Sequence, residues 1–143
     1  MAAQTLGMAA IARPGPAENP GRIRTLVVDD SPIFREFVCF VLEQEPAFEV
    51  VGEAANGQEA IQSALRLSPN LIIMDIQMPC LDGLEATSIL AQQLPETQVI
   101  LMSGENTAYI WSKSRRSGAA GFVPKLDFRD QLKAVLEQIF IHS

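Results

Sequence analysis

Apolar and polar positions follow two different periods along the chain after residue 22. Short apolar runs, typical of buried strands, are bounded by turn residues at Arg24–Asp29, Phe48–Ala54, Leu71–Asp75, Gln98–Ser103 and Gly121–Val123. Longer segments with apolar residues every three or four positions, typical of helices, lie between or after them: 32–45, Gln58–Leu67, Gly83–Leu94, Thr107–Ser117 and a helix within Leu126–Ile141. Five strand–helix units in series predict an α/β fold, a doubly wound five-stranded parallel sheet with five helices on both faces.

The first helical segment carries the clearest start signal. Ser31 is suited to cap the helix and Pro32 to occupy its first position, while Pro46 stops it. We expect its apolar residues to form one inward stripe: Ile33, Phe34, Phe37, Val38, Val41 and Leu42.

Residues 1–22 differ from the rest of the chain. They contain Pro14, Gly15, Pro16, Pro20 and Gly21 without sustained periodicity, which predicts a flexible N-terminal tail. We therefore expect one folded domain over residues 23–143, a length that can bury a hydrophobic core.

Composition narrows the class of protein. The formal net charge of −6 argues against direct contact with nucleic acid by this domain. Cys39 and Cys80 lack the spacing of a zinc site, and we expect both to be free thiols. No apolar run is long enough to span a membrane and no signal peptide is evident, so we expect a cytoplasmic protein without a membrane partner.

Polar side chains mark the carboxyl ends of several predicted strands. Asp29 and Asp30 end the first strand, Asp75 the third and Ser103 the fourth, and Lys125 follows the fifth. Ligands of such sheets bind outside these strand ends. Buried carboxylates are costly unless they hold a metal or change their pKa values, so the three acids predict a metal site.

The same residues carry a family resemblance. Val27-Val28-Asp29-Asp30, the 74–79 segment with Asp82-Gly83, Ser103 and the Gly118–Lys125 run are similar in order, spacing and strand position to the receiver domain of two-component response regulators. The Gly-Ala-Ala-Gly-Phe-Val-Pro-Lys run is most like receivers of helix-turn-helix (NarL/LuxR-type) transcriptional regulators. The resemblance implies a flavodoxin-like sheet of strand order 2-1-3-4-5. It also leads us to expect a cis peptide bond between Val123 and Pro124.

The resemblance implies a role for each acid. Asp75 would be the phosphoacceptor, taking a phosphoryl group from a sensor histidine kinase. Asp30 and Asp75 would bind Mg²⁺ directly, Asp29 through water, and the backbone carbonyl of Gln77 would complete the protein ligands. Such a protein is not an enzyme with external substrates, since it catalyses only its own phosphorylation and dephosphorylation.

A switch is implied as well. Ser103 and Lys125 would contact the phosphoryl group, and Phe122, which should favour a buried position, would turn inward as Ser103 moves. The surface of the fourth helix, fifth strand and fifth helix would then change to control an output, with possible homodimerisation on phosphorylation. The output would be transcription through a DNA-binding domain if this chain is a fragment of a longer regulator.

Other interpretations remain open at this point. Tyr109, Trp111 and Arg115 could form a partner surface or a partly packed, solvated basic face. The chain could instead be a phosphorylation-independent pseudo-receiver that only binds partners. A Mg²⁺-dependent phosphatase is a third option, although such sites typically need an acid where Gln77 stands.

Overall fold

The computed structural model describes residues 21–141. Most of the predicted tail, residues 1–20, and the last two residues lie outside this part of the chain. The prediction of a tail ending at residue 22 therefore remains untested.

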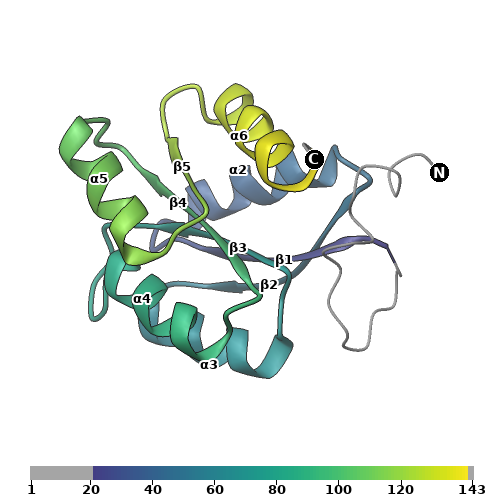
Figure 1. Ribbon diagram of the computed structural model, residues 1–143. Coiled ribbons are helices and arrows are strands. Elements are labelled where there is room, and N and C mark those ends of the chain that lie inside the picture. Colours follow the sequence, from purple (N-terminus) through teal and green to yellow (C-terminus); the bar gives the residue numbers. More distant parts are fainter. Residues whose placement is uncertain (1–20, 142–143) are drawn as a thin grey trace.

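The five predicted strands form one parallel sheet (Figure 1). Their bounds are β1 Ile23–Val28, β2 Phe48–Ala54, β3 Leu71–Asp75, β4 Gln98–Ser103 and β5 Gly121–Pro124. The strand order is β2-β1-β3-β4-β5 with every pair parallel, which confirms the predicted flavodoxin-like topology. The strands differ from the prediction by at most one residue at an end.

Within residues 21–141, five α-helices cover the two faces of the sheet. They are α2 Pro32–Glu43, α3 Gly57–Leu67, α4 Gly83–Gln93, α5 Ala108–Ser117 and α6 Phe128–Leu136, which continues as a π-helical turn η2 over Glu137–Ile141. In Figure 1, α2 and α6 lie on one face and α3 and α4 on the other. None of the described helices is long and apolar enough to cross a membrane.

Two apolar layers hold the sheet between the helices. One layer joins β-strand residues such as Val27 and Ile73 to α2 and α6, and the other joins Leu26 and Met74 to α3, α4 and α5. Alternate residues of one strand therefore face opposite layers, as the period of a strand requires. This double burial fixes the strands and with them the positions of their carboxyl ends.

The start of α2 follows the prediction, but its apolar stripe does not. The Ser31 side chain accepts a hydrogen bond from the Phe34 amide at 3.2 Å, and Pro32 is the first helical residue. Ile33, however, is 80% exposed and Phe37 is 37% exposed. With 3.6 residues per turn, each residue lies about 100° round the helix from the next. The stripe of Val38, Val41 and Leu42, with Phe34 partly buried beside it, therefore faces the sheet, while Ile33 and Phe37 lie to one side of it.

The expectation of a cis peptide bond between Val123 and Pro124 is wrong. The described chain contains no cis peptide bond, so Val123–Pro124 is trans. Pro124 is the last residue of β5 and pairs with Ser103 of β4, and the Lys125 amide then donates to the Ser103 carbonyl at 2.9 Å. Extended backbone therefore runs through the proline and delivers Lys125 to the end of the sheet.

Candidate functional site

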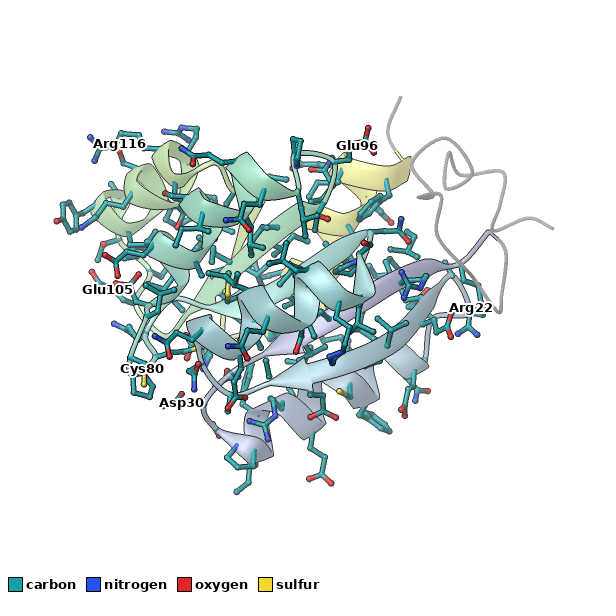
Figure 2. The ribbon with its side chains drawn as sticks, turned by 90° about the horizontal axis from the view of Figure 1, so that it is seen from below. Arg22, Asp30, Cys80, Glu96, Glu105 and Arg116 are labelled. Atoms are coloured by element: carbon teal, nitrogen blue, oxygen red, sulfur yellow. The ribbon has the colours of Figure 1, made fainter. Side chains whose placement is uncertain are left out.

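The parallel sheet gathers the predicted site residues at one end. Asp29 directly follows β1, Asp75 and Ser103 are the last residues of β3 and β4, and Lys125 directly follows β5. Because all strands run the same way, these positions share the carboxyl edge of the sheet. Figure 2 shows the loops that follow β1, β3 and β4 at the same end, through the labelled Asp30, Cys80 and Glu105, with Arg22 and Glu96 at the other.

The three acids form a compact cluster. One carboxylate oxygen from each of Asp29, Asp30 and Asp75 lies within 4.8 Å of the others. Asp29 is fully buried and Asp75 is 4% exposed, whereas Asp30 is exposed. Mg²⁺ binds oxygen at about 2.0–2.1 Å, so ligands of one ion lie within about 4.2 Å of each other. The cluster therefore fits Mg²⁺ after a small side-chain adjustment, with an open side for water at Asp30.

Lys125 supplies the opposing charge. Its Nζ lies 2.8 Å from Asp29 Oδ2 and 3.3 Å from Asp75 Oδ2, and its side chain is 23% exposed. Burial alone would lower the pKa of Lys125, but the bonds and charges of Asp29 and Asp75 outweigh it and hold that pKa above its ordinary value. The lysine is therefore a permanent cation beside the predicted acceptor.

The charged form of the Asp75 carboxylate is unfavourable in the fold. Burial raises its pKa from 3.8 to about 6; the neighbouring charge of Asp29 also raises it, while Lys125 and the Gln77 amide, which donates to Asp75 Oδ1 at 3.3 Å, lower it. A buried carboxylate whose neighbours do not fully compensate its charge favours a second cation. The surroundings of Asp75 are therefore suited to bind a cation in addition to Lys125.

Close backbone contacts hold the loop after Asp75. The Gly83 amide donates to the Ile76 carbonyl at 2.8 Å, and the Gly57 amide at the start of α3 donates to the Leu81 carbonyl at 3.1 Å. A Cβ at Gly83 would overlap the Asp75 carbonyl oxygen, and one at Gly57 would overlap that of Leu81. Both glycines are needed for this close approach. The sequence marked Asn56-Gly57 only as a turn, so the role of Gly57 beside the site was missed.

Two further residues that contact the site, one at Asp29 and one at Lys125, were also missed. Arg35 donates from Nη1 to the Asp29 carbonyl at 2.6 Å and pairs through Nε with Glu53 at 3.1 Å. The ring of Phe34 lies against Lys125, with 4.4 Å from Nζ to the ring centroid. The sequence held one usable signal for Arg35, since a helix that begins soon after Asp29 places its first turn within reach of Asp29.

The predicted switch residues lie on β4 and β5. Ser103 is fully buried, and its Oγ accepts a hydrogen bond from the Glu105 amide at 2.9 Å. Phe122 is 3% exposed, so its ring is buried in this structure, and the expected inward turn on phosphorylation stays a prediction. Its ring centroid lies 4.9 Å from that of Trp111 on α5.

The aromatic residues of α5 combine packing with exposure. Trp111 is 41% exposed, packs on Phe122 and donates from Nε1 to Asn106 Oδ1 at 2.7 Å. Tyr109 is 63% exposed, and Lys113 donates to its hydroxyl at 3.2 Å. Arg115 is exposed. Trp111 thus has a packing role. The rest of this face is exposed to solvent, and its role as a partner surface stays a prediction.

Comparison with known proteins identifies the family to which the chain belongs. Residues 25–137 match the response regulator receiver domain family. The protein-glutamate methylesterase/protein-glutamine glutaminase of Thermotoga maritima is 39% identical over 125 residues, covering 82% of this chain and 36% of that protein. Transcriptional regulatory protein DegU of Brevibacillus brevis is 35% identical over 107 residues, covering 75% of this chain and 45% of that protein. The chain thus spans less than half the length of these curated relatives.

A comparison with solved structures shows that the fold is also that of a receiver domain. The signal receiver domain of the response regulator NarL from Mycobacterium tuberculosis matches with a TM-score of 0.76 and 33% identity, over 82% of this chain and 95% of that one. Relatives with a methylesterase name and with a transcriptional name both match, so the receiver is shared while the outputs differ. The sequence match over 25–137, together with this fold, shows that the chain belongs to the response regulator receiver domain family, whose general role is a phosphorylation switch.

Proposed function

We propose that this chain is a two-component signalling switch in which Asp75 accepts a phosphoryl group from the phosphohistidine of a sensor histidine kinase. The observation that carries the proposal is the position of the Asp75 carboxylate. It is buried at the carboxyl edge of the sheet, in a cluster with Asp29 and Asp30, and 3.3 Å from the Lys125 ammonium. A carboxylate placed in this way can attack phosphorus while fixed charges meet the phosphoryl oxygens.

In this mechanism an Asp75 oxygen forms the new bond to phosphorus as the bond to the donor breaks. A Mg²⁺ held by Asp29, Asp30, Asp75 and the Gln77 carbonyl would neutralise charge on the phosphoryl oxygens. The Lys125 ammonium turns from the carboxylates toward another phosphoryl oxygen. Because the Lys125 ammonium already lies 3.3 Å from the reacting carboxylate, it needs only a short movement to meet the charge that develops in the transition state.

Switching would begin at Ser103. Its hydroxyl accepts from the Glu105 amide, and after phosphorylation it would instead donate to a phosphoryl oxygen. Movement of the Ser103 side chain alters the loop that leads to α5 and the packing of Phe122 against Trp111. The surface formed by α5, β5 and α6, including Tyr109 and Arg115, would then shift between two populations and change its affinity for an output partner or a second copy of the chain.

The mouth of the site is suited to a protein donor. Ile33 is 80% exposed on α2, Leu126 is 82% exposed directly after Lys125, and Phe37 is 37% exposed. Apolar side chains around a charged centre can dock a helical partner and exclude water from the transfer. This arrangement supports a protein such as a kinase as phosphodonor. We also propose that the chain acts in the cytoplasm and catalyses no reaction of external substrates.

For the output we propose only a general type of effector domain. The resemblance to helix-turn-helix regulators and the match to DegU favour transcription, through a domain beyond this receiver. The match to a methylesterase supports an enzymatic output domain as the second candidate.

Phosphorylation by a small donor tests the proposal. Wild type and Asp75→Ala are incubated with acetyl phosphate, with Mg²⁺ or with EDTA, and intact masses are measured. We expect the mass of one phosphoryl group to be added to wild type with Mg²⁺ and to neither control. A wild type that remains unmodified would overturn the switch and favour the pseudo-receiver.

A further inference from the structure

The ring of Phe34 contacts the lysine that the proposed chemistry needs. Lys125 Nζ lies over this ring, 4.4 Å from its centroid, while the same ammonium lies 2.8 Å from Asp29 Oδ2 and 3.3 Å from Asp75 Oδ2. The face of an aromatic ring is negative and attracts a cation at this distance. Phe34 is thus a third partner of the ammonium, and the one that carries no formal charge.

Other rings hold Phe34 in place. Its centroid lies 5.5 Å from that of Phe37 and 5.5 Å, edge to face, from that of Phe128. Phe128 is 2% exposed and begins α6, three residues after Lys125. The packing of α2 against α6 therefore supports the orientation of the Phe34 ring in addition to its contact with the lysine.

The contact between Phe34 and Lys125 matters most when Asp29 and Asp75 bind a metal or a phosphoryl group instead of the lysine. Lysine carries its charge on a flexible four-carbon stem, so its ammonium has many alternative positions. Once Asp29 and Asp75 serve a metal or a phosphoryl group, their hold on Lys125 weakens. The Phe34 ring keeps the same position, and attraction to its face is strengthened because the Lys125 side chain is only 23% exposed.

We propose that Phe34 is a positioning residue for phosphoryl transfer, whose ring face holds the Lys125 ammonium beside Asp75. This inference rests on the proposed function of Asp75. The competing explanation is that Phe34 only fills space between α2 and α6. The two differ in one property, since attraction to a cation depends on the charge distribution of the ring and packing depends on its shape.

Fluorinated phenylalanines separate these explanations. Mono-, di- and trifluorophenylalanine are incorporated at position 34, which keeps the ring shape while progressively weakening the negative face. We expect the phosphorylation rate with acetyl phosphate and Mg²⁺ to fall steadily along the series, by about fivefold in total. The phosphorylation rate of Phe34→Leu should fall by at least the same factor. A flat series accompanied by a loss in Phe34→Leu would show packing alone and overturn the proposal.

Phe40 provides the matched control. It lies on the same helix, and the guanidinium of Arg129 lies over its ring at 5.8 Å from the centroid. Trifluorophenylalanine at position 40 weakens this second cation–ring contact, away from the acids, and should leave the rate unchanged. An equal loss at positions 34 and 40 would count against a specific role for Phe34.

A second readout needs neither metal nor phosphodonor. In metal-free protein, the ring current of Phe34 should shift the Lys125 ε-methylene protons upfield, and Phe34→Leu should remove that shift. Unshifted protons in wild type would overturn the contact itself. If wild type takes up no phosphoryl group, the proposed function fails and this inference fails with it; if it is phosphorylated but the fluorinated series is flat, only the inference fails.

Discussion

Replacing Asp75 by asparagine should stabilise the metal-free domain, although it removes the predicted acceptor. The charged form of this carboxylate is unfavourable in the fold, since burial and Asp29 raise its pKa from 3.8 to about 6 against the opposing effect of Lys125. At 1.36 kcal/mol per pKa unit, ionising Asp75 above pH 6 costs the folded state up to about 3 kcal/mol. Asparagine keeps the shape of the protonated acid without the charge, so we expect a gain of about 1–3 kcal/mol at pH 8.

The pH dependence has a definite sign. Below pH 3.8 the acid is protonated in the folded and the unfolded chain, so Asp75→Asn has little effect. Between about pH 4 and pH 6 the folded chain binds the proton more tightly than the unfolded chain, and wild type loses stability as the pH rises. Above pH 6 the full difference between the two proteins is present.

Urea denaturation in EDTA at pH 4 and pH 8, followed by far-ultraviolet circular dichroism, measures the effect. Glu36→Gln removes one negative charge at an exposed position of α2 and controls for net charge. Added Mg²⁺ should stabilise wild type more than Asp75→Asn, because a ligand stabilises the state that binds it. An Asp75→Asn domain that is no more stable than wild type at pH 8 would refute the argument that burial opposes the charge.

Three further results follow from the described contacts. Gly83→Ala would place a methyl group against the Asp75 carbonyl and should lower the free energy of unfolding by about 1–3 kcal/mol, with slower phosphorylation; unchanged values in urea titration would contradict the close approach. Ser31→Ala removes the cap of α2 and should cost about 1 kcal/mol in the same titration, whereas an effect below a few tenths would show that the cap contributes little. Trp111 is the only tryptophan of the chain and packs on Phe122, so its fluorescence should change on phosphorylation and not in Asp75→Asn; an unchanged spectrum would argue against repacking at Phe122.

The sequence predicted the sheet and the site because both follow from local pattern. Apolar runs of strand length place their last residues at one edge of a parallel sheet, so Asp29, Asp75, Ser103 and Lys125 could be expected together before their distances were known. The helix start at Ser31 was equally local, since a cap bonds within its own turn.

Features set by packing between distant segments could not be predicted in this way. Phe34 meets Lys125 only because α2 and α6 lie on the same face of the sheet, and Gly57 meets Leu81 only because α3 begins beside the loop after β3. The exposure of Ile33 was a different error, since an apolar residue in a helical segment was assigned to the inward face although its angular position points elsewhere. The trans bond before Pro124 follows from the pairing of β5 with β4.

The location of the phosphoryl group tests the central claim most directly. Wild type is phosphorylated with acetyl phosphate and Mg²⁺, treated with borohydride, which reduces an acyl phosphate to the alcohol, and its peptides are sequenced by mass spectrometry. We predict homoserine at position 75 and unmodified aspartate at positions 29 and 30. Homoserine at either of those positions, or aspartate at all three, would contradict the assignment of Asp75 as the acceptor.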